Sequence, residues 1–173
     1  MRIIAGEHRG RRIDAPKGDI TRPTSDRARE SAFNLIGPVD GASVLDLFAG
    51  SGAMGLEALS RGAASCLFVD SSRAACRTID ANLERLGLHG TVLCQDAVSA
   101  LRRDRRVFDL VLCDPPYDAS GPGRLAPLLE THLAEDGLLV YESPSREAPP
   151  SVAGLTMRTS RTYGAARLTL FER

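Results

Sequence analysis

Short apolar runs alternate with amphipathic stretches along most of this chain. A short apolar run bounded by turn residues favours a buried strand, and apolar positions that recur every three or four residues favour a helix. Strands are expected at 43–48, 65–70, 91–96, 108–114, 137–143, 155–160 and 166–171. Helices are expected at 53–62 and 72–87, in a short stretch that ends at Leu101, and at 123–134. This alternation predicts an α/β fold with a parallel sheet covered by helices on both faces.

The start of the chain follows a different pattern, rich in glycine, proline and arginine. The segments Arg2–Ala5 and Arg11–Ala15 can pair as a short β-hairpin. A helix is expected from a cap at Thr24 or the following serine to Gly37, where a Gly-Pro pair ends it. Two parts are therefore expected, a basic extension that packs on the core over 1–37 and the main α/β domain over 38–173.

Basic residues gather in this first part, although the formal net charge of the 173 residues is zero. Before Glu30 there are eight basic residues against four acidic ones. Arginine binds phosphate and stacks on bases, so one interpretation is a contact with RNA and the other is a solvated charged surface. The arm has no apolar stripe, which favours RNA contact over packing, and the domain is expected to fold without residues 1–20. The candidate RNA contacts are Arg9, Arg11, Arg12 and Arg22.

The overall composition is that of a globular domain, with 43% hydrophobic residues. The chain shows neither the apolar stretch of a signal peptide at its start nor a run long enough for a membrane span, so a cytoplasmic protein without membrane contact is expected. Its four cysteines lack paired zinc spacing, so buried core thiols and no metal site are expected. These cysteines are Cys66, Cys76, Cys94 and Cys113.

A glycine-rich loop follows the first expected strand, in the phrase DLFAGSGAMG. Gly50, Gly52 and Gly55 match GxGxxG between a strand and a helix, and Asp70 ends the next strand. Glycines at such a position let a cofactor approach backbone amides, and the acid can accept hydrogen bonds from ribose hydroxyls. The pattern therefore predicts a cofactor of the adenosine type.

Further features favour S-adenosylmethionine over a nicotinamide. Asp46 lies inside the strand before the loop, where a carboxylate suits a cationic amino acid group and is awkward beside a pyrophosphate. The phrase AMGLEALSRGA that follows is common in methyltransferases. Asp96 closes the third strand and is placed to accept from an adenine amino group. For Asp70 and Asp96 the alternative is an ordinary polar strand end.

The most specific signal is Asp114-Pro115-Pro116-Tyr117, at the end of the fourth expected strand. Consecutive prolines restrict the backbone, so the Pro115 carbonyl is aimed rigidly beside the Asp114 carboxylate. Two acceptors held together can bind both hydrogens of an amino group, and Tyr117 offers a face on which a base can stack. The alternative is a simple turn after a buried strand. The position beside a glycine loop favours methylation of an exocyclic amine on an unpaired base.

The sequence resembles the bacterial small-subunit (16S) ribosomal RNA guanine-N2 methyltransferases of the D type. The shared phrases are MRIIAGEHRGRRI, RPTSDRARESAFNLI, VLDLFAGSGAMGLEALSRGA, LCDPPY and the terminal YG-x-x-x-L-x-L. The resemblance implies a Rossmann-like methyltransferase fold with a seven-stranded, mostly parallel sheet whose last strand is antiparallel. It also implies transfer of one methyl group from S-adenosylmethionine to a guanine amine, in ribosomal RNA or in the small ribosomal subunit.

The resemblance also implies roles for individual residues. The target base is expected at Asp114, Pro115, Pro116 and Tyr117, and the N-terminal arginines are expected on RNA. Thr24 and Arg27 are expected to pack against the cofactor and the catalytic loop. The expected cofactor residues are Asp46, Phe48, Ala49, Gly50, Ser51, Gly52, Asp70 and Asp96, with Thr24 and Arg27.

Four other functions compete with this one. DNA adenine-N6 methylation and protein glutamine-N5 methylation use a similar motif before Pro-Pro-Tyr. The chain has no large target-recognition domain, and a glutamine enzyme usually carries Asn where this chain has Asp114. A nicotinamide-dependent oxidoreductase would leave the proline motif unexplained. A non-catalytic RNA-binding assembly factor on the same fold is the fourth alternative.

Overall fold

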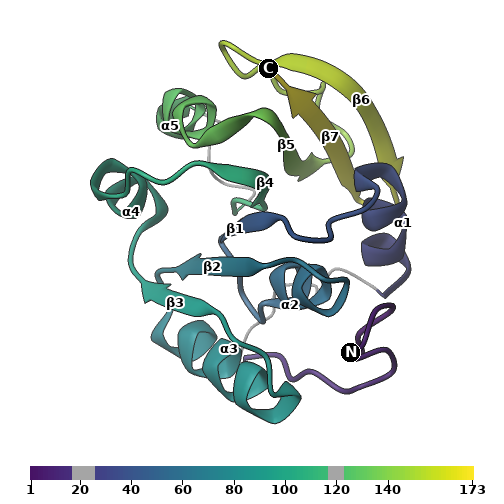
Figure 1. The fold of residues 1–173 in the computed structure, drawn as a ribbon. Helices are drawn as coiled ribbons and strands as arrows, with labels where there is room; N and C mark the ends of the chain where they lie inside the picture. Colours follow the sequence, from purple (N-terminus) through teal and green to yellow (C-terminus); the bar gives the residue numbers. More distant parts are fainter. Residues whose placement is uncertain (17–25, 117–122) are drawn as a thin grey trace.

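A seven-stranded sheet organises the chain, with the strand order β3-β2-β1-β4-β5-β7-β6 (Figure 1). The structure is a computed structural model that describes residues 1–16, 26–116 and 123–173. Neighbouring strands from β3 to β5 pair in parallel, and β7 is antiparallel to both β5 and β6. The predicted α/β sheet with an antiparallel last strand is confirmed. The strands are β1 (Ser43–Leu47), β2 (Ser65–Asp70), β3 (Thr91–Cys94), β4 (Phe108–Cys113), β5 (Leu133–Pro144), β6 (Thr156–Tyr163) and β7 (Ala166–Glu172).

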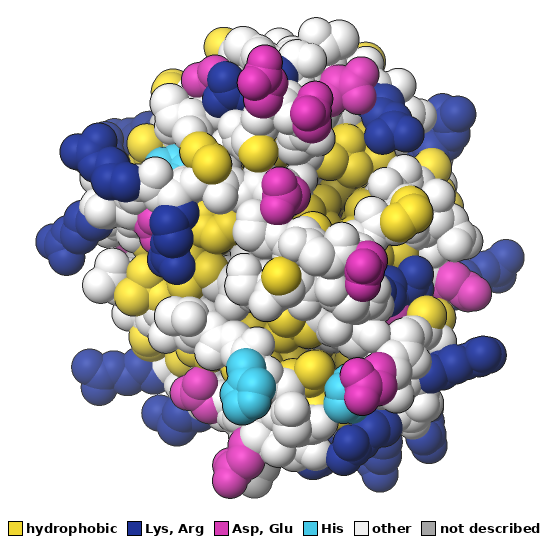
Figure 2. Space-filling view, viewed as in Figure 1, with side chains coloured by type: hydrophobic (Ala, Val, Ile, Leu, Met, Phe, Trp, Pro, Cys, Tyr) yellow, Lys and Arg dark blue, Asp and Glu magenta, His cyan; other side chains and the backbone are white. Residues whose placement is uncertain are grey.

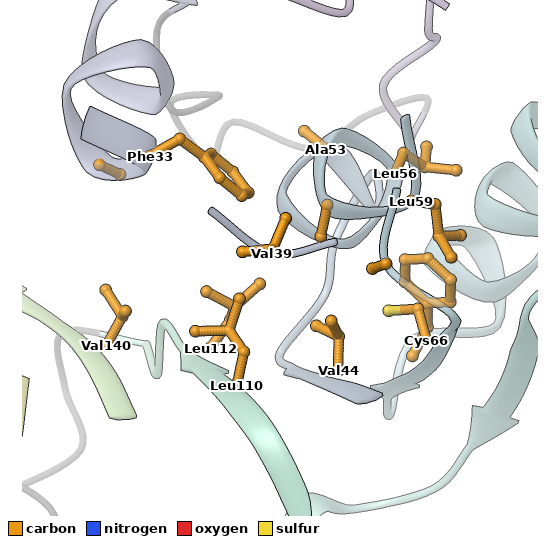
Figure 3. Close-up of a cluster of buried hydrophobic side chains, with 14 of the residues drawn as sticks. Phe33, Val39, Val44, Ala53, Leu56, Leu59, Cys66, Leu110, Leu112 and Val140 are labelled. Carbon is orange, nitrogen blue, oxygen red and sulfur yellow. The ribbon is translucent and has the colours of Figure 1, made fainter. Parts of the chain in front are cut away.

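Helices cover both faces of this sheet, and each face has its own apolar core. One core joins the sheet to α1, α2, α3 and the N-terminal segment, residues 1–14, and the other joins it to α4, η1 and α5. Neighbouring residues of β1, Val44 and Leu45, enter opposite cores, as expected of a strand buried on both faces. Figure 3 shows Phe33, Val39 and Leu56 packed over the strands in the first core. The helices are α1 (Asp26–Ile36), α2 (Ala53–Ser60), α3 (Arg73–Leu86), α4 (Ala97–Arg103), the 3-10 helix η1 (Gly123–Leu125) and α5 (Ala126–Thr131).

Local signals explain where the longest helix begins and ends. The Ser72 hydroxyl accepts from the Ala75 amide at 3.3 Å and caps the start of α3. Gly87 ends the helix with a left-handed φ of 67°, a conformation that glycine adopts without a steric penalty. None of the helices within the described ranges is long and apolar enough to cross a membrane.

Two expectations from the sequence are wrong. The helix expected at 123–134 ends at Thr131, and the chain enters β5 at Leu133, which pairs with Phe108 on β4. Pairing across the sheet therefore overrides the helical pattern of this segment. Cys94 is exposed rather than buried, because β3 is an edge strand and only the other three cysteines lie in the interior.

Candidate active site

The carboxyl ends of the central strands bring the predicted motifs to one edge of the sheet. Leu47 at the end of β1 pairs with Val69 on β2 and with Cys113 on β4. The glycine loop after β1 therefore lies between Asp70, which ends β2, and Asp114, which follows β4 (Figure 1). The strand order reverses between β1 and β4, and open α/β sheets bind their ligands at such a reversal.

The glycine loop has three residues in the left-handed region, with φ values of 58° at Phe48, 56° at Gly50 and 76° at Gly52. A non-glycine residue such as Phe48 is strained there, and such strain concentrates at functional sites. A Cβ on Gly50 would have no neighbour closer than 4.0 Å, so this side of the backbone is open to a ligand. Gly55 has another purpose, because a Cβ there would lie 2.3 Å from the Phe68 ring. Gly55 therefore lets α2 pack on β2.

Asp70 supports the loop from the end of β2. One carboxylate oxygen accepts from the Gly50 amide at 2.8 Å, and the other accepts from the Ser72 amide, also at 2.8 Å. The carboxylate is thus fixed between the glycine loop and the start of α3. A carboxylate oxygen can accept more than one hydrogen bond, so this geometry leaves acceptor capacity for ribose hydroxyls.

Asp46 lies beneath the loop and is 4% exposed. Its carboxylate accepts from the Gly55 amide at 2.9 Å and so holds the first turn of α2. Burial, together with the charge of Asp70, raises the pKa of Asp46 to about 7, although the Gly55 amide opposes the shift. A buried carboxylate with a raised pKa gains from a nearby cation, which fits the amino acid group of S-adenosylmethionine.

Asp96 lies at the helix start that follows β3. Its carboxylate accepts from the Ser99 amide at 2.9 Å and caps α4. The residue is exposed at the same edge of the sheet as the other acids. The structure therefore gives Asp96 a capping role that the sequence analysis did not include, and its contact with adenine stays a prediction.

Asp114 is an exposed residue whose surroundings nevertheless disfavour the charged form of its carboxyl group. Desolvation by the surrounding protein, followed by the carboxylates of Glu142 and Asp46, raises its pKa to about 8. Such a side chain is reached by water yet surrounded by protein on most sides. Pro115 is buried and Pro116 is exposed, so the two prolines leave the sheet toward solvent. This arrangement presents Asp114 beside the glycine loop.

Tyr117, Thr24 and Arg22 lie outside the described residues, so their expected roles stay predictions. Arg27 is exposed on α1. The buried charge of that helix is Arg29, which the sequence analysis did not select.

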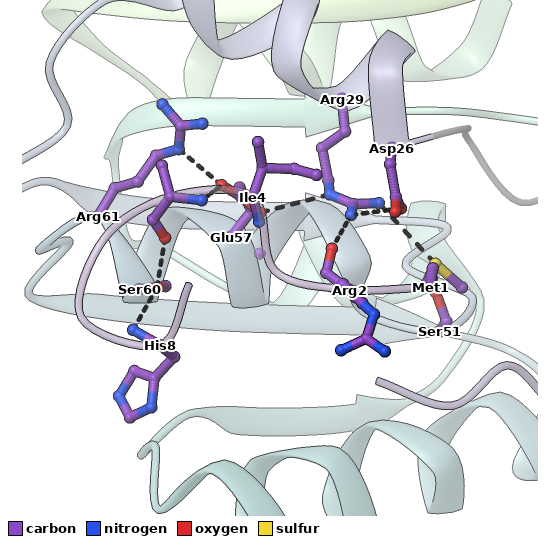
Figure 4. Close-up of polar contacts among 12 residues, drawn as sticks. Met1, Arg2, Ile4, His8, Asp26, Arg29, Ser51, Glu57, Ser60 and Arg61 are labelled. Atoms are coloured by element: carbon purple, nitrogen blue, oxygen red, sulfur yellow. Dashed lines mark hydrogen bonds and ion pairs between the residues drawn. The ribbon is translucent and has the colours of Figure 1, made fainter. Parts of the chain in front are cut away.

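Glu57 and Arg29 form the centre of a buried polar network that sequence reasoning missed (Figure 4). The Glu57 carboxylate on α2 accepts from the Ile4 and Ala5 amides at 2.8 and 2.9 Å, and from Arg61 at 2.8 Å. Arg29 donates to Glu57 at 3.4 Å and also to the backbone carbonyl of Arg2. A signal was present, because Arg29 and Glu57 are charged residues on the apolar faces of two expected helices.

The N-terminal segment, residues 1–14, is therefore part of the core. Its hairpin is reduced to one antiparallel bridge between Arg2 and Arg12. Ile3 and Ile13 are 1% and 2% exposed, so the expectation that this arm lacks packing residues is wrong. Two apolar residues at a spacing unlike that of a helix or strand gave no recognisable stripe.

The arginines of this segment differ in their availability. Arg9 and Arg12 are exposed, whereas the Arg11 guanidinium donates to the Arg85 carbonyl at 2.8 Å, in the last turn of α3. Figure 2 shows that basic side chains stand mainly around the outline of the face in view. Arg9 and Arg12 stay candidates for phosphate contact, and Arg11 already has a structural partner.

Comparisons with known proteins identify the family of the chain. The family described as "Conserved hypothetical protein 95" matches residues 1–172. The chain belongs to this family. Over its full length it is 36% identical to Ribosomal RNA small subunit methyltransferase D of Escherichia coli, of which it covers 90%. It is 30% identical to the protein of the same name from Haemophilus influenzae, with 99% of this chain and 93% of that protein covered. The resemblance to small-subunit methyltransferases of the D type is thereby confirmed.

Solved structures extend the agreement to the fold. The Escherichia coli protein yhhF superposes with a TM-score of 0.90 at 36% identity, over 100% of this chain and 97% of that chain. The protein SMU.776, solved in complex with SAH, gives a TM-score of 0.69 over 84% of this chain and 49% of that chain. At 17% identity the second likeness shows the fold alone.

Proposed function

We propose that this protein transfers a methyl group from S-adenosylmethionine to the exocyclic N2 amino group of a guanine in small-subunit (16S) ribosomal RNA. The observation that carries the proposal is the placement of Asp114 and the two prolines beside an open glycine loop at the strand-order reversal. The family relatives named as small-subunit ribosomal RNA methyltransferases support the substrate class. Ribosomal RNA as substrate would also place the protein in the cytoplasm.

The residues present fit S-adenosylmethionine. The open backbone side at Gly50 accommodates an approaching ligand, Asp70 has acceptor capacity for ribose hydroxyls, and Asp46 gains from a cationic group. When bound, this cofactor supplies an electrophilic methyl group. Asp96 is exposed at the same edge, where its second oxygen can accept from the adenine amino group.

Asp114 supplies the chemistry on the substrate side. Its ionised carboxylate accepts a hydrogen bond from the target amine and orients the nitrogen lone pair toward the methyl group. Its pKa of about 8 also suits a group that takes up the proton released by the amine, because a general base works best with a pKa near the operating pH. Asp114 is therefore the catalytic residue of the proposal, and the rate should rise with pH up to about 8.

A methyl-transfer assay tests the substrate. Purified protein and radiolabelled S-adenosylmethionine are incubated with small ribosomal subunits, or with naked 16S RNA, from a strain that lacks its own methyltransferase D. Nucleoside analysis is expected to place the label in N2-methylguanosine, and Asp114→Ala is expected to lower the rate by a factor of about 100 or more while cofactor affinity stays within a few-fold. Label in N6-methyladenine or in protein would contradict the proposal and favour one of the alternative amine substrates.

A further inference from the structure

Asn82 is a fully buried side chain of α3 that joins the N-terminal segment to the glycine loop. Its Oδ1 accepts from the Asp14 amide at 2.9 Å, and its Nδ2 donates to the Asp14 carbonyl at 3.0 Å. The same Nδ2 donates to the Ser51 carbonyl at 3.1 Å. These three partners are backbone groups, and together they occupy both amide hydrogens and the carbonyl oxygen of Asn82, which also accepts from the Arg85 guanidinium at 3.5 Å.

Ser51 lies between the two left-handed glycines of the loop, so this contact acts where the cofactor is proposed to bind. The other end of the N-terminal segment also reaches Ser51, because the Ser51 hydroxyl lies 3.9 Å from the Met1 sulfur (Figure 4). Arg29 approaches the same sulfur at 3.8 Å. The N-terminal segment therefore contacts the loop near both of its ends, through Met1 directly and through Asp14 by way of Asn82.

The loop gains from such support, because its backbone is strained. Phe48 holds a positive φ angle, and a non-glycine residue in this conformation persists only when its surroundings fix it, whereas Gly50 and Gly52 adopt it without a steric penalty. Asp70 fixes the loop at the Gly50 amide, and Asn82 fixes it one residue later at the Ser51 carbonyl. The two contacts come from different elements, β2 and α3.

We infer that Asn82 is a positioning residue, which holds the glycine loop in its cofactor-binding conformation and ties that conformation to the N-terminal segment. A shift of Asp14 would move Asn82 and release the Ser51 carbonyl. If the exposed arginines of this segment hold RNA, which rests on the proposed function, a shift of the segment on RNA binding reaches the glycine loop, and cofactor binding then changes RNA affinity by the same factor in return. Asn82 is the residue through which that influence passes.

Two matched variants of α3 test the inference. Asn82→Ala removes the bonds to both Asp14 and Ser51. Arg85→Ala removes an ion pair with the Asp14 carboxylate and a 3.5 Å hydrogen bond to Asn82 Oδ1, but it keeps the bond between Asn82 and Ser51. Titration calorimetry with S-adenosylhomocysteine is expected to show about tenfold weaker binding for Asn82→Ala, because the Ser51 carbonyl of the loop loses its donor, and less than a twofold change for Arg85→Ala. Thermal melts without ligand show that both proteins are folded.

The coupling is measured with 16S RNA as the second probe. For the wild-type protein, saturating S-adenosylhomocysteine is expected to tighten RNA binding severalfold, and for Asn82→Ala this ratio should fall to about one. An Asn82→Ala protein that binds S-adenosylhomocysteine within twofold of wild type would overturn the inference. If that variant does not fold, Asn82→Asp replaces it, because it keeps the side-chain volume and the acceptor for the Asp14 amide but loses the donor to Ser51. The calorimetry needs no RNA. Failure to methylate ribosomal RNA would therefore refute the proposed function, whereas the positioning role of Asn82 is decided by the calorimetry alone.

Discussion

The glycine loop and the N-terminal segment lie side by side, but the sequence encodes them in opposite ways. Two supports of the loop belong to its own motif, with Asp46 on the Gly55 amide and Asp70 on the Gly50 amide. The N-terminal segment is held by distant side chains, such as Glu57, 53 positions from Ile4, and Asn82, 68 positions from Asp14. The comparison shows that a segment without a hydrophobic pattern can still be core, when distant side chains satisfy its backbone.

Glu57→Ala is expected to have the largest effect, because it removes the main contacts that hold the N-terminal segment. The change leaves the Ile4 and Ala5 amides without their acceptor and leaves the buried Arg29 guanidinium with Asp26 as its remaining carboxylate partner. Removing one partner of a buried ion pair costs about 3–5 kcal/mol, so the melting temperature is expected to fall by roughly 10 °C. The control is Glu130→Ala, which removes a partly exposed pair with Arg173 and should cost less than about 1 kcal/mol. Equal melting temperatures for the two variants would show that the Glu57 network does not hold the segment.

Asp70→Ala tests the glycine loop instead of the N-terminal segment. It removes the acceptor of the Gly50 and Ser72 amides together with the proposed ribose contact. Cofactor affinity is expected to fall at least about tenfold, since hydrogen bonds to a charged group contribute about 1.5–3 kcal/mol each. RNA affinity should hardly change. Calorimetry with S-adenosylhomocysteine measures the effect, with the exposed Asp80 on α3, changed to alanine, as a control. Unchanged affinity in Asp70→Ala would remove Asp70 from the cofactor site.

Asp46→Asn tests the support beneath the glycine loop through the pH dependence of the melting temperature. The pKa of Asp46 is raised from 3.8 to about 7 in the folded protein, so the folded state binds more protons than the unfolded state between these values. Stability therefore falls as pH rises from about 4 to 7, and the asparagine variant escapes this loss. Without ligand, Asp46→Asn is expected to melt a few degrees above wild type at pH 8, with no gain at pH 4.

Asp109→Asn is the matched control with the opposite sign. Hydrogen bonds from Ser43 lower the pKa of Asp109, so its ionised form stabilises the protein above the unfolded pKa, and the variant should melt lower at pH 8. A fall in melting temperature for Asp46→Asn at pH 8 would contradict the assignment of Asp46 as a buried carboxylate whose charge destabilises the folded protein.

The smallest effect is expected from a double variant that separates the packing of the N-terminal segment from its proposed contact with RNA. Replacing the exposed Arg9 and Arg12 by alanine should leave folding and cofactor affinity unchanged. Each lost phosphate contact should lower the slope of log RNA affinity against log salt by about 0.7–0.9. Arg173→Ala serves as the control because Arg173 pairs with Glu130. A salt slope that does not change in the double variant would assign these arginines to a solvated surface.

The sequence could predict the parts of the molecule whose contacts repeat a known local geometry. The strand Ser65–Asp70 has the predicted bounds, and the glycine loop and Asp70 meet as the motif requires. Helix ends marked by glycine, such as Gly87, were also predictable. In each case the residues that form the sequence motif and the groups that they contact lie on adjacent elements.

The remaining features depend on contacts that no local pattern carries. Ile3 and Ile13 are ten residues apart and belong to no periodic apolar pattern, and only the assembled fold shows that both are buried. Because they complete a core, truncation of residues 1–20 is now expected to destabilise the protein, contrary to the expectation from the sequence. Likewise, a single asparagine within an amphipathic helix gives no sign that it bonds two distant backbones.

The position of β7 has a consequence for synthesis on the ribosome. This strand lies between β5 and β6, although it follows both of them in the chain. Until residues 166–172 have emerged, the edge of β5 from Leu139 to Pro144 has no partner, and an unpaired strand edge can pair with other chains. A nascent chain that pauses before residue 166 is therefore exposed to aggregation. Pulse-labelled nascent chains stalled before and after β7 would differ in their demand for chaperones.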